Sequence, residues 1–231
     1  MEAKHLAPEH IETIFEWDMT NWSRCITFFQ KHLETQNQLT CLELGGRRGG
    51  MSFWMALNGH DVICSDLTSP EEIAGPLHGS YELKGSIQYS AIDALDISYE
   101  NHFDLIMFKS VLGGVSREGN DQKKAECLQQ IYKALKPGGK VIIAENLTAS
   151  WLHRSLRKRF VKWGGLWNYL EYHEVDELFQ EFRNVRYHSV GFFGAFGRTE
   201  NQRRFLGKID KAIDRLVPKS MRYIVFVIAT K

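Results

Sequence analysis

Short apolar runs recur along the chain and alternate with segments whose apolar residues follow a helical spacing. Helix-compatible segments lie at Met51 to Asn58, Asp121 to Leu135 and Glu174 to Phe182. The strand-like runs are Leu39 to Leu44, Asp61 to Ser65, Ile87 to Ala91, Phe103 to Phe108, Lys140 to Ala144, Val185 to Gly191 and Tyr223 to Thr230. Alternation of this kind predicts an α/β fold with three α/β/α layers around a doubly wound, mostly parallel sheet of seven strands.

Breaks in the pattern indicate how the runs are joined. Leu135-Lys136-Pro137-Gly138-Gly139-Lys140 should end a helix and turn into a strand, because Pro and Gly cannot continue the helix. Gly113-Gly114 should form a flexible loop after the fourth strand. Between Gly191 and Tyr223 no clean crossover returns the chain for a parallel neighbour, so we expect the last strand to be antiparallel.

Three segments stand outside the alternation, and we expect all of them to belong to a single domain spanning 1–231. They are an N-terminal helical region, 1–38, expected to form a lid; a basic, aromatic stretch, 147–171; and an insertion before the last strand, 192–220. Segments of this kind are the natural places for a lid and a substrate site.

Composition, charge and cysteine spacing exclude several classes of protein. The chain has 231 residues, 43% of them hydrophobic, and a net charge of +1, so one full-sized core is expected and no global basic charge calls for nucleic acid. Its four cysteines are widely spaced and form no C-x-x-C pair, which favours reduced thiols in a cytoplasmic protein and offers no metal site. The first thirty residues lack the continuous apolar block of a signal peptide, and no window approaches the roughly 20 apolar residues of a membrane span.

Residues 41–50 carry the clearest chemical signal. The apolar run Cys41-Leu42-Glu43-Leu44 ends in an acid and is followed by Gly45-Gly46-Arg47-Arg48-Gly49-Gly50 and a helix-compatible segment. Glycines allow positive φ and close approach to the main chain, and a helix start offers free N–H groups. The segment therefore predicts a strand, a tight loop and a helix that cradle a nucleotide.

The order of the signals resembles that of the class I S-adenosylmethionine-dependent methyltransferases over roughly residues 39–146 and the last strand. In that family the first strand ends in E/D-x-G-x-G-x-G, which Glu43, Gly45 and Gly49 match, whereas Arg47 stands at the middle glycine position. The resemblance extends to an acid after the second strand, Asp66, and one after the third, Asp93. The run Phe103 to Phe108 and the Lys-Pro-Gly-Gly turn also match the family pattern.

The resemblance implies S-adenosyl-L-methionine as cofactor and assigns residues to its parts. Asp66, with Leu67 beside it, would hold the ribose hydroxyls; Asp93, between Ile92 and Ala94, would hold the adenine amine. Glu43 would orient the glycine loop or approach the methionine ammonium through a water. Gly45, Gly46, Arg47 and Gly49 of the loop would lie against the cofactor, together with Lys109 and, from the lid, Trp22. The competing interpretation of each acid is a loop or helix cap, and that of Trp22 is a core position beside Phe15 and Phe29.

Two alternatives concern the glycine loop itself. A dinucleotide-binding dehydrogenase is disfavoured because the loop lacks the G-x-G-x-x-G spacing. Arg47 and Arg48 would pair with the methionine carboxylate or an anionic acceptor, or they would point into solvent.

The stretch between Glu145 and Glu171 contains no acid, and its cations alternate with aromatic residues. Such a composition suits phosphate binding, stacking on sugars or bases, or a membrane interface, and the competing interpretation is a solvated basic helix. Its residues are Trp151, Arg154, Arg157, Lys158, Arg159, Phe160, Lys162, Trp163, Trp167 and Tyr169; a second amphipathic stretch contributes Arg203, Arg204, Phe205, Lys208, Ile209, Lys211, Arg215 and Leu216. The block also resembles methyltransferase-like proteins of bacterial polysaccharide and lipopolysaccharide biosynthesis, which implies a saccharide hydroxyl on a small or lipid-linked acceptor and contact with the inner face of the membrane.

Transfer to a hydroxyl needs a group that accepts its proton. The candidates are His153, then His173 and Glu145; Lys109 is a weaker one because it should be protonated unless buried. The predicted function is O-methylation of a saccharide-type or lipid-linked small acceptor. Methylation of RNA or protein, and a non-catalytic membrane-surface protein with a degenerate cofactor fold, are the alternatives. The acceptor, the base and the oligomeric state stay open.

Overall fold

The computed structural model describes residues 6–33, 37–160 and 166–231. It contains a seven-stranded sheet in the order β3-β2-β1-β4-β5-β7-β6. The strands are β1 (Thr40–Leu44), β2 (Asp61–Asp66), β3 (Ile87–Ala91), β4 (Phe103–Lys109), β5 (Leu135–Asn146), β6 (Arg183–Val190) and β7 (Ile224–Thr230). The pairings from β3 through β5 are parallel, and β7 is antiparallel to both β5 and β6, which confirms the predicted fold and the antiparallel last strand.

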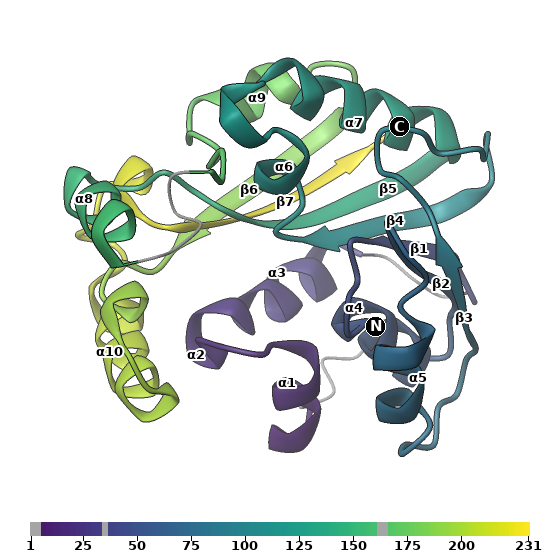
Figure 1. Cartoon of the computed structure of the whole chain (residues 1–231), viewed down its shortest axis with the longest axis horizontal. Coiled ribbons are helices and arrows are strands. Elements are labelled where there is room, and N and C mark those ends of the chain that lie inside the picture. The colour runs from purple at the N-terminus through teal and green to yellow at the C-terminus, as the bar shows by residue number, and fades with distance from the viewer. Residues whose placement is uncertain (1–5, 34–36, 161–165) are drawn as a thin grey trace.

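Helices cover both faces of the sheet, as Figure 1 shows. One face carries α1 (Pro8–Ile14), α2 (Met19–Trp22), α3 (Arg24–His32), α4 (Gly50–Leu57) and α5 (Glu71–His78); the other carries α6 (Leu112–Val115), α7 (Gln122–Ala134) and α9 (Glu174–Leu178). At one end of the molecule lie α8 (Trp151–Phe160) and α10 (Glu200–Ile213). Short 3₁₀ turns are η1 (Arg117–Gly119), η2 (Gly194–Phe196) and η3 (Lys219–Met221).

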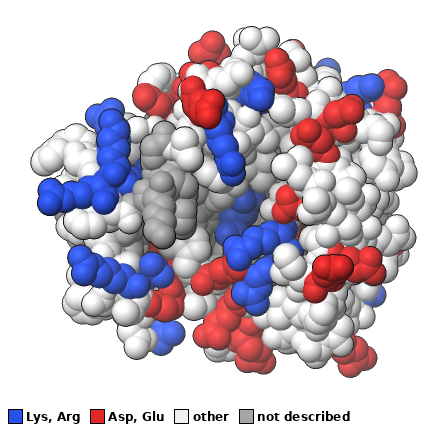
Figure 2. Space-filling model, in the orientation of Figure 1, with Lys and Arg blue, Asp and Glu red and all other residues white. Residues whose placement is uncertain are grey.

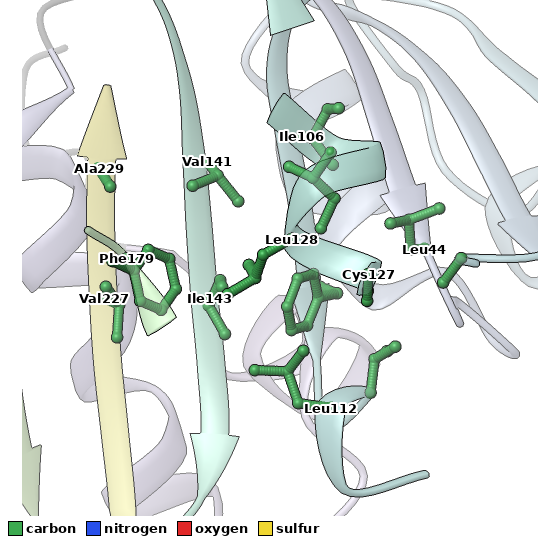
Figure 3. Packing of buried hydrophobic residues seen from close by; sticks show 14 of the residues in the cluster. Leu44, Ile106, Leu112, Cys127, Leu128, Val141, Ile143, Phe179, Val227 and Ala229 are labelled. Atoms are coloured by element: carbon green, nitrogen blue, oxygen red, sulfur yellow. The ribbon is translucent and has the colours of Figure 1, made fainter. Parts of the chain in front are cut away.

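Strand residues alternate between two apolar cores, one on each face of the sheet. From β7, Val225 and Val227 enter the core beneath α7, whereas Phe226 enters the core beneath α1 to α4. Figure 3 shows Leu128 of α7 and Phe179 close to Ile143 of β5 and Val227 of β7. Both faces of the central strands are therefore buried, which explains why β1, β4 and β7 are nearly continuous apolar runs in the sequence, whereas the edge strands β3 and β6 keep exposed polar residues.

Two local expectations were wrong. Helix α7 does end before the Lys-Pro-Gly-Gly segment, but β5 already begins at Leu135, which pairs with Phe103 across an irregularity in the β4–β5 register. Gly113 and Gly114 lie in the short helix α6 rather than in a flexible loop. A Cβ on Gly113 would fall 1.9 Å from Nε1 of Trp167, so the glycine is required by an aromatic side chain packed against it.

The N-terminal region and the 192–220 insertion pack together near the carboxyl ends of the strands. Asp210 of α10 accepts hydrogen bonds from Asn21 of α2 at 2.9 Å and from the N–H groups of Phe193 and Gly194. Glu200 accepts the N–H groups of Asp18 and Met19 at 2.9 and 3.0 Å. The order of strands reverses between β1 and β4, where ligands of open α/β sheets bind. These two segments therefore flank the edge at which a ligand site is expected.

Candidate functional site

The glycine loop leaves β1 at the carboxyl edge and leads directly into α4. Gly45, Arg47 and Gly49 have φ values of 61°, 46° and 66°, and the N–H of Gly46 donates to the carbonyl of Ser65 on β2 at 2.7 Å. Gly49 is enclosed by protein, since an added Cβ would lie 2.5 Å from the His78 ring. Arg47, at the middle glycine position of the family motif, adopts a left-handed conformation that costs an L-residue roughly 1–2 kcal/mol.

Glu43 holds this loop and the start of α4 in place from below. Its side chain is buried and accepts the N–H of Met51 at 3.2 Å and both the N–H and the hydroxyl of Ser52 at 2.7 and 2.5 Å. Burial raises the pKa of Glu43 to about 7, while the bonds from Ser52 act in the opposite direction. Its carboxyl group is therefore engaged by the main chain and side chain at the start of α4.

Asp66 and Asp93 lie at the same edge, at the ends of the neighbouring strands β2 and β3. Asp66 accepts the N–H groups of Arg47 at 3.0 Å and Leu67 at 2.8 Å. Asp93 is exposed and accepts the N–H of Leu95 at 2.9 Å, and the N–H of Ile92 donates to the carbonyl of Asp66 at 2.9 Å. Each carboxylate caps a loop, as the alternative interpretation proposed, and each keeps lone pairs for further donors. Beside them Leu67 is 71% exposed, whereas Ala94 is buried.

Lys109 ends β4 between Glu43 on β1 and Glu145 on β5. Its Nζ lies 5.2 Å from the centre of the Trp22 ring, and within the described residues no carboxylate forms an ion pair with it. Burial lowers the pKa of Lys109, and Glu16, Glu43 and Glu145 oppose that shift. Trp22 is fully buried in the core with Phe15 and Phe29, as the packing alternative proposed.

Sequence inspection offered no signal for Glu16, which lies between α1 and α2 and faces the glycine loop. Its two carboxylate oxygens lie 3.4 Å from Nη1 of Arg48 and 3.4 Å from Nη1 of Arg47. Both guanidinium groups therefore pair with the N-terminal region in this structure. Figure 2 shows Lys and Arg side chains gathered around a hollow in the middle of this face of the molecule.

The three candidate bases have different surroundings. Glu145 is fully buried and accepts the N–H groups of Val111 and Leu112, each at 2.8 Å; burial raises its pKa to about 7. His153 is also buried, with Nε2 donating to the Phe192 carbonyl at 2.9 Å and Nδ1 2.7 Å from the Ser150 hydroxyl. Burial lowers the pKa of His153 to about 4. His173 is exposed beside Glu171 at the start of α9.

Glu145 and His153 are thus engaged in hydrogen bonds within the protein, whereas the exposed His173 lies 3.4 Å from Glu171. Within the described residues, no hydrogen bond or ion pair joins any two of these three side chains. A cavity of about 300 Å³ lies elsewhere, between α7 and α9, and none of the predicted site residues lines it.

The arrangement fits an adenosyl cofactor. Two carboxylates at adjacent strand ends suit a vicinal diol and an exocyclic amine, and the loop between them exposes main chain. The strand order and this edge together define a class I S-adenosylmethionine-dependent methyltransferase. A family model described as a methyltransferase domain matches residues 17–190, and the chain belongs to that family. The predicted enzyme class and cofactor, S-adenosyl-L-methionine, are confirmed.

Comparison with known proteins adds relatives of low similarity. Phosphoethanolamine N-methyltransferase 3 of Arabidopsis thaliana is 34% identical over 106 residues, which are 45% of this chain and 20% of the relative. Phosphoethanolamine N-methyltransferase 2 of Haemonchus contortus, solved with phosphomonomethylethanolamine and S-adenosylhomocysteine, matches with a TM-score of 0.62 at 17% identity. That match covers 96% of this chain and 56% of the other.

A methyltransferase structure from Methanosarcina mazei gives a TM-score of 0.61 at 17% identity and covers 88% of this chain and 96% of the other. At these identities the structural likenesses concern the fold. The chain spans one fifth of the Arabidopsis relative and about half of the Haemonchus chain.

Proposed function

We propose that the chain methylates a small acceptor that carries a phosphate or another anionic group. The observation that carries the proposal is the set of three cations, Arg47, Arg48 and Lys109, around the edge where the cofactor residues Asp66 and Asp93 lie. Carboxylates suit the adenosyl part of the cofactor, whereas guanidinium and ammonium groups suit phosphate oxygens. One edge would thus hold both partners.

In this proposal Asp66 and Leu67 hold the ribose, and Ile92, Asp93 and Ala94 hold the adenine. Gly45, Gly46 and Gly49 lie along the methionine part. Bound S-adenosylmethionine supplies an electrophilic methyl group on a positively charged sulfur. The protein would accelerate transfer mainly by aligning donor and acceptor and excluding water.

Two classes of acceptor share the anionic group. The first, predicted from the sequence, is a saccharide linked to a nucleotide or a lipid, methylated on oxygen. The second is a phosphorylated amino alcohol methylated on nitrogen, the substrate class named for the Arabidopsis and Haemonchus relatives. The amine of an amino alcohol is protonated at neutral pH, but its proton can pass to solvent before the amine binds, and the neutral amine then attacks without a general base at the reacting atom. The second class is therefore favoured by the internal hydrogen bonds that occupy Glu145 and His153.

The four cysteines are buried free thiols, which supports the proposed cytoplasmic location. Within the described parts of the chain, no helix has the length and apolar character needed to cross a bilayer.

Calorimetry with S-adenosylhomocysteine tests the cofactor assignment. Asp66→Ala should weaken binding by about 1–3 kcal/mol, because the charged acceptor of two ribose hydroxyls is lost. Glu100→Ala, at an exposed acid just before the start of β4, is the matched control and should bind like the unchanged protein. Equal affinity in all three proteins would remove the ribose assignment, and no binding by the unchanged chain would favour the non-catalytic alternative.

The acceptor is tested by transfer of a radiolabelled methyl group. Phosphoethanolamine and a panel of nucleotide-linked sugars are supplied separately, and unphosphorylated ethanolamine and free sugars serve as controls. Labelling of either phosphorylated class alone identifies the substrate class. Equal labelling of the unphosphorylated controls would refute the anionic-acceptor proposal.

A further inference from the structure

Helices α8 and α10 form the end of the molecule seen at the left of Figure 1, and both are anchored to the same short loop. His153 of α8 donates to the carbonyl of Phe192, and Asp210 of α10 accepts the N–H groups of Phe193 and Gly194. Both anchoring side chains are buried, at 1% exposure each. Successive residues of one loop thus fix the two helices as neighbouring parts of one surface.

The outward side of α8 is basic and aromatic. Residues on the side away from His153 include Trp151, Arg154 and Lys158, all exposed, and Trp151 is 69% exposed. Arg159 and Phe160 at the helix end are also exposed. Arg157, grouped with these cations from sequence alone, turns inward instead, because its guanidinium donates to the carbonyls of Leu147 and Thr148 and lies 4.1 Å from the Tyr169 ring centre.

Helix α10 and the turn after it repeat this arrangement with acids confined to the inner side. Arg204, Lys208, Lys211 and Arg215 are exposed, and so are Phe205 at 65% and Leu216 at 82%. Asp210 is buried, and Asp214 forms an ion pair with Arg24 of α3.

Acids are absent from the exposed positions of both stretches. None of the described residues of 151–160 and 201–216 is an exposed Asp or Glu. The net charge of the whole chain is only +1, so the excess of positive charge is confined to surfaces such as this one. Figure 2 shows Lys and Arg side chains over this end of the molecule.

We propose that the outward sides of α8 and α10 are a docking surface for an anionic phospholipid membrane. Cations interspersed with exposed Trp, Phe and Leu on a helix that lies flat are the composition of an interfacial helix. Lys and Arg attract the anionic headgroups, and the apolar side chains enter the headgroup boundary. Leu216 argues for a bilayer over nucleic acid, because an aliphatic side chain offers no face on which a base stacks.

The membrane-docking proposal does not depend on the identity of the acceptor, because it rests on the exposed residues of α8 and α10 and not on those at the carboxyl edge of the sheet. It also agrees with, but does not require, a lipid-linked substrate. The enzyme would then work beside the membrane without spanning it.

Sedimentation with vesicles tests the proposal. The intact chain is mixed with vesicles of phosphatidylcholine alone or with 30% phosphatidylserine added, a composition on the order of anionic leaflets. The combined variant Arg154→Gln, Lys158→Gln and Arg159→Gln removes three outward cations. The matched control, Lys31→Gln, Lys133→Gln and Arg183→Gln, removes three exposed cations from α3, α7 and β6.

Binding to the anionic vesicles should exceed binding to neutral ones and should fall as salt is added. Each cation near an anionic surface strengthens binding about fivefold, so the α8 variant should bind on the order of 100-fold more weakly. The control variant should bind as the unchanged chain does. A Trp151→Ala, Phe205→Ala double variant should lose the part of the binding that survives high salt.

Equal binding to neutral and anionic vesicles, or equal loss in the α8 and control variants, would overturn the proposal. Binding of a DNA or RNA duplex that depends on the same three cations, without vesicle binding, would assign the surface to nucleic acid instead. S-adenosylhomocysteine affinity, measured on the same proteins, should be unchanged in all variants and shows that each one is folded.

Discussion

The substitution Glu43→Gln tests how the protein holds the glycine loop and the start of α4 in place at the carboxyl edge of the sheet. The substitution keeps the size of the side chain and removes its ability to carry charge. In the structure Oε2 of Glu43 accepts two donors from Ser52, at 2.7 and 2.5 Å, and Oε1 accepts the N–H of Met51 at 3.2 Å. These bonds tie the end of β1 to the first turn of α4.

The loss of folding stability in Glu43→Gln depends on how many buried donors lose their acceptor. The amide of the variant has one acceptor oxygen, which satisfies the pair from Ser52, and its NH₂ group then faces the N–H of Met51. One buried donor without an acceptor costs about 1–3 kcal/mol. For a chain of this size that corresponds to a fall in Tm of about 2–12 °C.

The ionisation of Glu43 determines how the stability difference between the two proteins changes with pH. Burial raises the pKa of Glu43 from its ordinary 4.5 to about 7, so the folded state holds a proton that the unfolded state releases between these values. The stability from this group is fully present below pH 4.5 and is lost as the pH rises through 7. At 1.36 kcal/mol per pH unit the loss is about 3 kcal/mol, and the uncharged Gln side chain does not share it.

The penalty of Glu43→Gln should therefore be largest near pH 5 and shrink by up to about 3 kcal/mol at pH 8. Urea unfolding of both proteins at four pH values across this range measures the difference, in which the other titrating groups cancel. Parallel stability profiles for the two proteins, or no penalty at pH 5, would refute the reasoning.

Three further predictions concern the surroundings of the site. Arg47→Gly should change the S-adenosylhomocysteine affinity by less than about threefold, because glycine adopts the positive φ of this position freely. The KM of an anionic acceptor should rise, because the cation is lost. A much larger loss of cofactor affinity would place the guanidinium on the cofactor. His153→Ala should lower the free energy of unfolding by about 2–4 kcal/mol, because the Ser150 hydroxyl and the Phe192 carbonyl lose their partner and a cavity is left. The pH profile of kcat should not change. A large fall in kcat with unchanged stability would instead support His153 as the predicted base. Burial raises the pKa of Asp18 to about 7, so its contribution to stability is lost as the pH rises through 7, and Asp18→Asn should flatten the stability profile between pH 5 and 8 in urea unfolding; a profile identical to that of the unchanged chain would contradict this.

The central strands were predictable because they are buried on both faces. The run Phe103 to Phe108 contains a single polar residue, Asp104, next to its start, so the strand position is visible in the sequence, as are the acids that follow other strands. Asp66 and Asp93 were placed at one edge by this argument, and β2 and β3 do pair side by side. The start of β5 was misjudged because Pro137 and Gly138 are tolerated at an irregular pairing.

The roles of polar side chains within helices and loops were less accessible to sequence reasoning. His153 and Arg157 stand in one basic helix, yet both turn inward to backbone carbonyls while Arg154 and Lys158 face outward. The position of Gly113 against Trp167 likewise depends on a residue far along the chain. Such orientations depend on contacts between segments that are distant in sequence.

By itself the sequence determined the α/β class and the acids that follow the strands, because these depend on local apolar runs and on residues at strand ends. The adenosyl cofactor followed from the resemblance of these motifs to the class I methyltransferases. Only the tertiary structure decided that Glu16 faces Arg47 and Arg48, that the candidate bases Glu145 and His153 are engaged internally, and that α8 and α10 expose cations on one surface. The physical reason is that a polar side chain takes its role from the partners that fold around it, and those partners come from anywhere in the chain.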